Sequence, residues 1–125
     1  MSGADKEELS AFVTTTFDSI WSLELLLHLR HHETRGWTHG ELVRALRARD
    51  AVVSRSVQTL TAAGLLLVDA QGSARFAPAN AELRDLVTAA DHLYKTSPGA
   101  VRRMIINSSH AGLTAFANAF RLRKD

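Results

Sequence analysis

Residues 38–78 read THGELVRALRARDAVVSRSVQTLTAAGLLLVDAQGSARFAP and contain the signals for two helices and a β-hairpin. Thr38 is followed three positions later by Glu41, which is the spacing of a capping box and predicts a short helix over about residues 39–47. Asp50 is a candidate N-cap, so a second helix is expected to begin directly after it. The sequence therefore predicts two short helices separated by a tight turn.

The hydrophobic period changes after this second helix, which we expect over about residues 51–63. Gly64 suits a left-handed C-cap at its end. Residues 65–68 and 74–77 read as short strands, and the turn-forming residues 69–73 lie between them. The stretch thus predicts helix, helix and β-hairpin, in that order.

Helical spacing of apolar residues continues on both sides of this stretch. Residues 9–32 predict one long helix or two abutting helices, and residues 23–29 are apolar nearly all round, as in a central buried helix. From Asn80 the spacing is helical again, and Ser97 before Pro98 marks the start of a further helix. The hairpin is therefore expected to lie between helical segments.

Length and composition fit one domain. The chain has 125 residues, 46% of them apolar, and no cysteine, which excludes disorder, disulfides and thiolate metal sites. We expect a single domain over residues 1–125, with a core at about residues 20–78 and a helical extension at about residues 80–125. No apolar run approaches the roughly 18 residues of a membrane span, and no secretory signal is visible, so we expect a soluble, cytoplasmic protein.

The charges are unevenly distributed, although the net charge of +2 by itself indicates no partner. Residues 1–36 carry six acidic and three basic side chains, residues 37–79 carry three and five, and residues 80–125 carry four and seven. All five basic residues of the middle segment are arginines. The excess of positive charge therefore lies in the middle and at the end of the chain.

The order of the expected elements is that of a winged helix, and residues 41–68 resemble the multiple-antibiotic-resistance regulator (MarR-type) family. The matching residues are VSRSV at 53–57, Leu60, and AGLL at 63–66. The resemblance implies a mainly α fold with a small β-hairpin, a winged helix-turn-helix with additional C-terminal helices. It also implies a bacterial transcriptional regulator, with the helix at 51–63 as recognition helix.

The way in which a helix-turn-helix docks on double-stranded DNA indicates which residues of this chain would contact it. A helix-turn-helix places its second helix in the major groove, where Arg reads guanine and Gln reads adenine. Ser54, Arg55 and Gln58 lie on the side expected to be exposed. The arginines expected to hold the DNA backbone or the minor groove are Arg44, Arg47, Arg49 and Arg75. An ordinary solvated arginine-rich face is the alternative interpretation.

A protein-binding adaptor is the second function that this fold would serve. The modest charge, the apolar start AVV of the recognition helix at 51–53 and the single basic residue of the wing favour it. DNA binding through several arginines should weaken steeply with salt, which distinguishes the two functions.

Catalysis and metal binding find little support. The sequence has no Gly-rich phosphate loop, nucleophile elbow or His-Glu-x-x-His motif, so we expect no enzyme and no cofactor. One group of side chains has spacings that suit a zinc or iron ion: Glu24, His28, His31, His32 and His39. A polar last helical turn, favoured by the helix dipole, is the simpler interpretation, so we expect no metal.

Two further expectations concern partners. Trp21 and Trp37 would line a pocket for a small-molecule effector, although core packing is the more frequent role of tryptophan. After an expected break at residues 107–112, a last helix has an apolar stripe: Leu113, Phe116, Ala117 and Phe120. This stripe needs a cover, either residues 9–27 of the same chain or a second copy, and we expect a homodimer.

Overall fold

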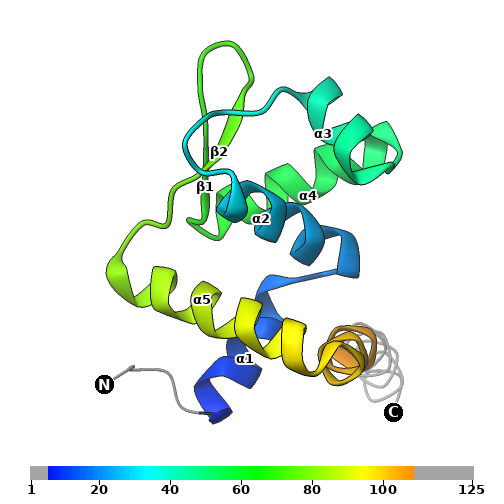
Figure 1. Ribbon diagram of the computed structural model, residues 1–125, viewed down its shortest axis with the longest axis vertical. Helices are drawn as coiled ribbons and strands as arrows, with labels where there is room; N and C mark the ends of the chain where they lie inside the picture. Colours follow the sequence, from blue (N-terminus) through cyan, green and yellow to red (C-terminus); the bar gives the residue numbers. More distant parts are fainter. Residues whose placement is uncertain (1–5, 109–125) are drawn as a thin grey trace, which may run out of the picture.

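The computed structural model describes residues 6–108 (Figure 1). The elements in chain order are α1 (Lys6–Thr16), α2 (Ile20–His31), α3 (His39–Leu46), α4 (Asp50–Ala62), β1 (Leu66–Val68), β2 (Ala74–Phe76) and α5 (Ala81–Thr96), followed by a helical segment at 98–108. The fold is mainly α with one small antiparallel hairpin, in the order of a winged helix-turn-helix. The expected fold class is confirmed, including helices after the wing.

The first helical stretch is two helices, which decides between the alternatives that the spacing left open. Phe17 lies between α1 and α2 and is only 2% exposed. Ser19 is the N-cap of α2, and its side chain accepts a hydrogen bond from the backbone N–H of Ser22 at 3.3 Å. A buried aromatic ring followed by a capping serine thus ends one helix and starts the next.

The capping box of α3 is present as predicted. The Thr38 side chain accepts from the Glu41 N–H at 3.2 Å, and the Glu41 carboxylate accepts from the Thr38 N–H at 2.9 Å. The prediction of Asp50 as the N-cap of α4 is wrong. Arg49 occupies that position without a side-chain cap, and Asp50 is the first helical residue, with its carboxylate 2.9 Å from Nε2 of His39.

The wing is a hairpin in which Leu66 pairs with Phe76 and Val68 with Ala74. Its turn is organised by Asp69, whose side chain accepts from the N–H groups of Gln71 and Ser73, both at 2.9 Å. The strand β2 is also bonded to the loop before α3, because Trp37 and Ala74 exchange two backbone hydrogen bonds, at 2.7 and 2.8 Å. The wing is thereby fastened to the helix-turn-helix.

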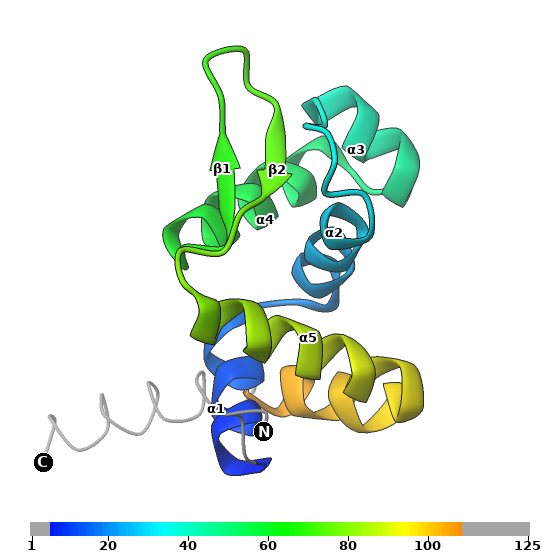
Figure 2. The same cartoon turned by 60° about the vertical axis from the view of Figure 1, so that its left-hand side comes forward.

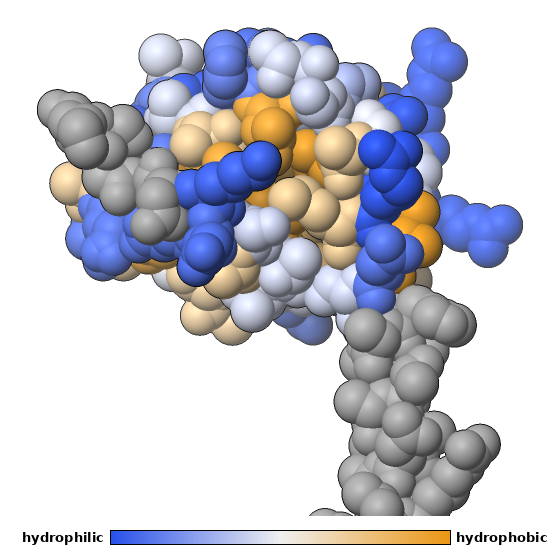
Figure 3. All heavy atoms as spheres, turned by 90° about the horizontal axis from the view of Figure 1, so that it is seen from below, coloured by the Kyte–Doolittle hydropathy of each residue, from blue (hydrophilic) through white to orange (hydrophobic). Residues whose placement is uncertain are grey.

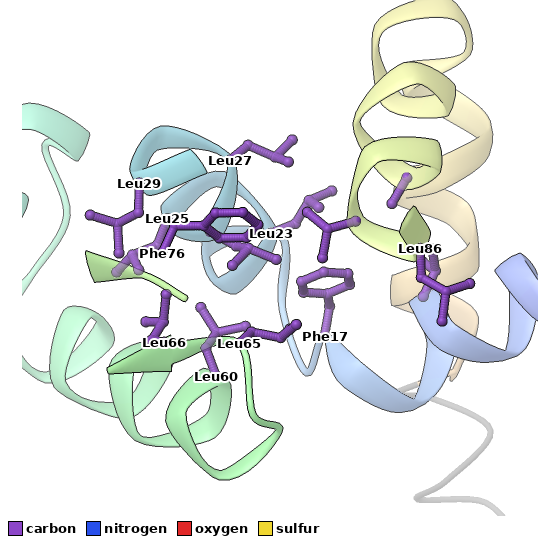
Figure 4. Close-up of a cluster of buried hydrophobic side chains, with 14 of the residues drawn as sticks. Phe17, Leu23, Leu25, Leu27, Leu29, Leu60, Leu65, Leu66, Phe76 and Leu86 are labelled. Carbon is purple, nitrogen blue, oxygen red and sulfur yellow. The ribbon is translucent and has the colours of Figure 1, made fainter. Parts of the chain in front are cut away.

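The core is centred on α2, as its apolar sequence predicted. Leu23, Leu26 and Leu29 are fully buried, and Leu60 of α4 packs into the same cluster. Figure 4 shows side chains of α2, α4 and both strands meeting there, with Phe17 between this group and α5. The helix-turn-helix and wing lie at one end of the molecule and α1, α5 and segment 98–108 at the other (Figure 2).

The lower end of the molecule carries apolar surface between hydrophilic side chains (Figure 3). In segment 98–108, Val101 and Ile105 are buried, whereas Ile106 is 63% exposed. The expected break is wrong at its start, because residues 107 and 108 are still helical. The rest of that break and the apolar stripe at 113–120 lie outside the described residues. Within residues 6–108, no helix is long and apolar enough to cross a membrane.

Candidate nucleic-acid interface

The helix α4 exposes the side that the sequence predicted. Val53 and Leu60 are buried at 1% and 0% exposure, so the helical period turns the opposite side to solvent. Ser54, Arg55 and Gln58 are exposed. A recognition helix needs this arrangement, in which the apolar stripe fixes the helix and leaves polar side chains free to contact a partner.

The three exposed residues of α4 do not share one environment. Ser54 and Gln58 line a hollow of about 200 Å³ between α4, the start of α3 and the wing, together with His39 and Gly72. Arg55 instead lies beside the α1–α2 linker, where its Nε is 3.0 Å from Oδ2 of Asp18. Sequence reasoning missed Asp18, because no local pattern connects residues 37 positions apart.

The four arginines predicted to hold the DNA backbone are all exposed. Arg44 lies on α3, Arg47 and Arg49 flank the turn between α3 and α4, and Arg75 lies on β2. Within residues 6–108, none of the four forms an ion pair, whereas Arg30, Arg35, Arg55 and Arg84 do. These four unpaired arginines lie on α3, the α3–α4 turn and the wing, which form one end of the molecule (Figures 1 and 2 show the elements).

The segment that carries these arginines also has three carboxylates, of which Glu41 pairs with Arg35. Asp50, at the start of α4, has a side chain that is 84% exposed and pairs with His39. Asp69 is engaged by the wing turn. Because the N-terminus of a helix favours negative charge, Asp50 stabilises α4 even without acting as its cap.

The histidines of α2 do not converge on one point. The ring of His28 packs against Trp37, with centroids 4.4 Å apart, and against His32 at 4.6 Å. His31 instead bonds Asp91, at 2.8 Å. Burial lowers the pKa of His28, and the nearby His32, His31 and Arg35 lower it further.

The remaining members of the possible metal set also have other partners. Glu24 accepts a hydrogen bond from the Tyr94 hydroxyl, and His39 bonds Asp50. Burial, followed by the hydrogen bond to Glu24, raises the pKa of Tyr94. Among residues 6–108, no group of three or more His, Cys, Asp or Glu side chains is arranged to hold a metal ion.

The two tryptophans line different hollows. Trp21, which is 39% exposed, lies with Glu24, Leu46 and Tyr94 in a hollow between α2, α3 and α5. Trp37 lines the hollow beside α4, and the Arg35 guanidinium stacks on its ring at 3.7 Å. Within residues 6–108, the two tryptophans therefore line separate hollows and not the one pocket that the sequence interpretation gave them.

No family model matches the chain, and no curated protein sequence does. Among solved structures, the fold is similar to that of S. aureus MepR bound to ethidium bromide, with a TM-score of 0.46 and 18% identity over 91% of this chain and 89% of that chain. At this level of similarity, what the protein does has to be argued from its own residues.

Proposed function

We propose that this chain is a DNA-binding transcriptional regulator of the MarR-like type, which acts as a homodimer in the bacterial cytoplasm. The observation that carries the proposal is that four exposed arginines without ion pairs within residues 6–108 gather on α3, the α3–α4 turn and β2: Arg44, Arg47, Arg49 and Arg75. Unpaired guanidinium groups on both sides of an exposed helix match the phosphates that flank a major groove.

The mechanism is binding without chemistry. Arg55 and Gln58 read base edges, Ser54 supports them, and the four unpaired arginines neutralise phosphates. Each phosphate contact should contribute about −0.9 to the slope of log K against log salt concentration. In the homodimer, two recognition helices about 34 Å apart would meet successive turns of the major groove.

The test is selection of bound fragments from genomic DNA, followed by salt titration on the selected duplex. Arg49→Gln and Arg75→Gln should each reduce the salt slope by about 0.9. Arg103→Gln is the matched control, because it removes an exposed arginine from segment 98–108 at the opposite end of the molecule. The proposal would be wrong if the wild-type chain bound no duplex at low salt. It would also be wrong if all three variants changed the salt slope equally.

A protein-binding adaptor remains the second candidate, and the wing provides the observation that favours it. Leu67 and Val68 on β1 are 62% and 43% exposed, an unusual apolar surface for a wing that contacts phosphates. The adaptor function predicts binding that tolerates salt and is lost in Leu67→Ser. Under the DNA-binding function, Leu67→Ser should leave the salt slope unchanged.

A further inference from the structure

Arg55 differs from the other arginines of this interface because it is held by a carboxylate. Its Nε donates to Oδ2 of Asp18 at 3.0 Å, while 78% of its side chain remains exposed. Within residues 6–108 the side chain has no other hydrogen-bond partner. The bond therefore uses the inner nitrogen of the guanidinium and leaves its two terminal nitrogens available.

The backbone on both sides of Asp18 is held in place. On one side of it, Phe17 is buried and its N–H bonds the Val13 carbonyl at 3.2 Å. On the other side, Ser19 caps α2. The Asp18 side chain is itself only 31% exposed. Because the backbone is held on both sides, Arg55 is the partner that adjusts its position to Asp18.

Holding Nε matters for a base contact and little for a phosphate contact. Reading guanine requires two N–H groups in a defined plane, whereas a phosphate accepts a cation over a wide range of orientations. An arginine side chain that nothing holds loses rotamer entropy when a contact immobilises it. A carboxylate on Nε removes part of this loss before binding and sets the plane of the terminal nitrogens.

We propose that Asp18 is a positioning residue for base recognition, which orients Arg55 so that its terminal nitrogens meet a base edge. This inference rests on the proposed DNA-binding function. Asp18 should therefore contribute to specificity and, because its negative charge opposes phosphates, should slightly weaken non-specific binding. Removal of the Asp18 carboxylate is therefore expected to lower the specificity and to raise the non-specific affinity.

The experiment measures the dissociation constants of the full chain for a selected duplex and for a scrambled duplex. Asp18→Ala should lower the ratio of specific to non-specific affinity about tenfold, the scale of a contact between neighbouring residues. Non-specific affinity should rise in the same variant. Asp18→Asn, which keeps the shape and a weaker acceptor, should restore part of the ratio. In an Arg55→Ala background, Asp18→Ala should change the ratio no further.

Glu33→Gln is the matched control, because Glu33 pairs with Arg84 on the surface and its loss removes the same charge from outside the helix-turn-helix. Equal melting temperatures of the variants would show that folding is intact. A second measurement needs no DNA: hydrogen exchange of the Arg55 Nε–H should be slower in the wild type than in Asp18→Asn.

Each outcome decides a specific point. If both affinities rise equally in Asp18→Ala and the ratio is unchanged, Asp18 only repels phosphates and the positioning role is wrong, while the DNA-binding function stands. Equal exchange of the Arg55 Nε–H in both chains would likewise overturn the positioning role. A wild-type chain that binds neither duplex at low salt would overturn the DNA-binding function and this inference together.

Discussion

The Arg30 guanidinium of α2 donates to the buried carboxylate of Asp91 on α5, so that an ion pair joins the central helix to the helix behind it. The Asp91 side chain is 4% exposed and that of Arg30 25%. His31 also bonds the same carboxylate oxygen, at 2.8 Å. Among the acids that form ion pairs within residues 6–108, Asp91 is the one that is buried, and its pair with Arg30 connects α2 to α5.

Arg30→Ala should lower the free energy of unfolding by about 2–3 kcal/mol. Breaking a buried ion pair costs about 3–5 kcal/mol, and the loss here is smaller because His31 and Lys95 remain near Asp91. The measurement is urea denaturation. Glu33→Gln breaks an exposed pair and should cost no more than about 1 kcal/mol. Equal losses in the two variants would show that the burial of Asp91 is without energetic consequence.

The stability of the protein should fall as the pH drops through 6.5, in part because of His28. Its pKa in the folded chain is lowered from 6.5 by burial, so the unfolded chain binds the proton first. The contribution of this group to stability is present above pH 6.5 and is lost as the pH falls toward the folded pKa. Unfolding free energies measured from pH 8 down to pH 5 should therefore decrease less steeply in His28→Phe than in the wild type. Identical slopes in His28→Phe and wild type would contradict this assignment.

Leu60→Ala should destabilise the chain by about 2–5 kcal/mol, because a fully buried leucine is replaced by a cavity beneath α4. Leu67→Ala is the matched control, since the same atoms are removed from a side chain that is 62% exposed. Its effect should lie within about 0.5 kcal/mol of zero. Thermal or urea unfolding of both variants gives the comparison. A loss of stability in Leu60→Ala as small as that in Leu67→Ala would mean that the core collapses around the gap.

Gly64→Ala should cost about 1–2 kcal/mol, because Gly64 has φ +79° and an L residue is strained there. A Cβ would meet Ala79 at 3.4 Å, which is ordinary contact, so strain is the main cost. Gly40→Ala is the opposite case, since Gly40 lies inside α3 and a Cβ would meet only Arg44. It should raise stability by about 0.4–1 kcal/mol. The same sign for both variants would refute the role of backbone conformation.

The parts of the fold that sequence reasoning predicted depend on short-range patterns. The capping box of Thr38 and Glu41, the left-handed Gly64 and the buried side of α4 all involve residues within a few positions of one another. The wrong assignment of Asp50 has the same origin. A local rule identifies Asp50 as a candidate N-cap, but it takes no account of His39, which lies 11 positions away in sequence and bonds the Asp50 carboxylate.

The candidate interface was predictable only as a set of outward positions. The helical period placed Ser54, Arg55 and Gln58 on the exposed side of α4, but it gave no sign that Arg55 separates from the other two. That separation depends on Asp18, just as the connection between α2 and α5 depends on Asp91, 61 residues after Arg30. Such partners follow from tertiary packing, which a period in one helix does not contain. Contact of these residues with DNA stays a prediction.

The two hydrogen bonds between Trp37 and Ala74 use main-chain atoms alone, so they depend on no particular side chain. Only proline, which lacks an N–H, would abolish one of them. Substitutions at the exposed wing positions Leu67 and Arg75 would therefore change what the wing contacts and leave its attachment to the loop before α3 in place.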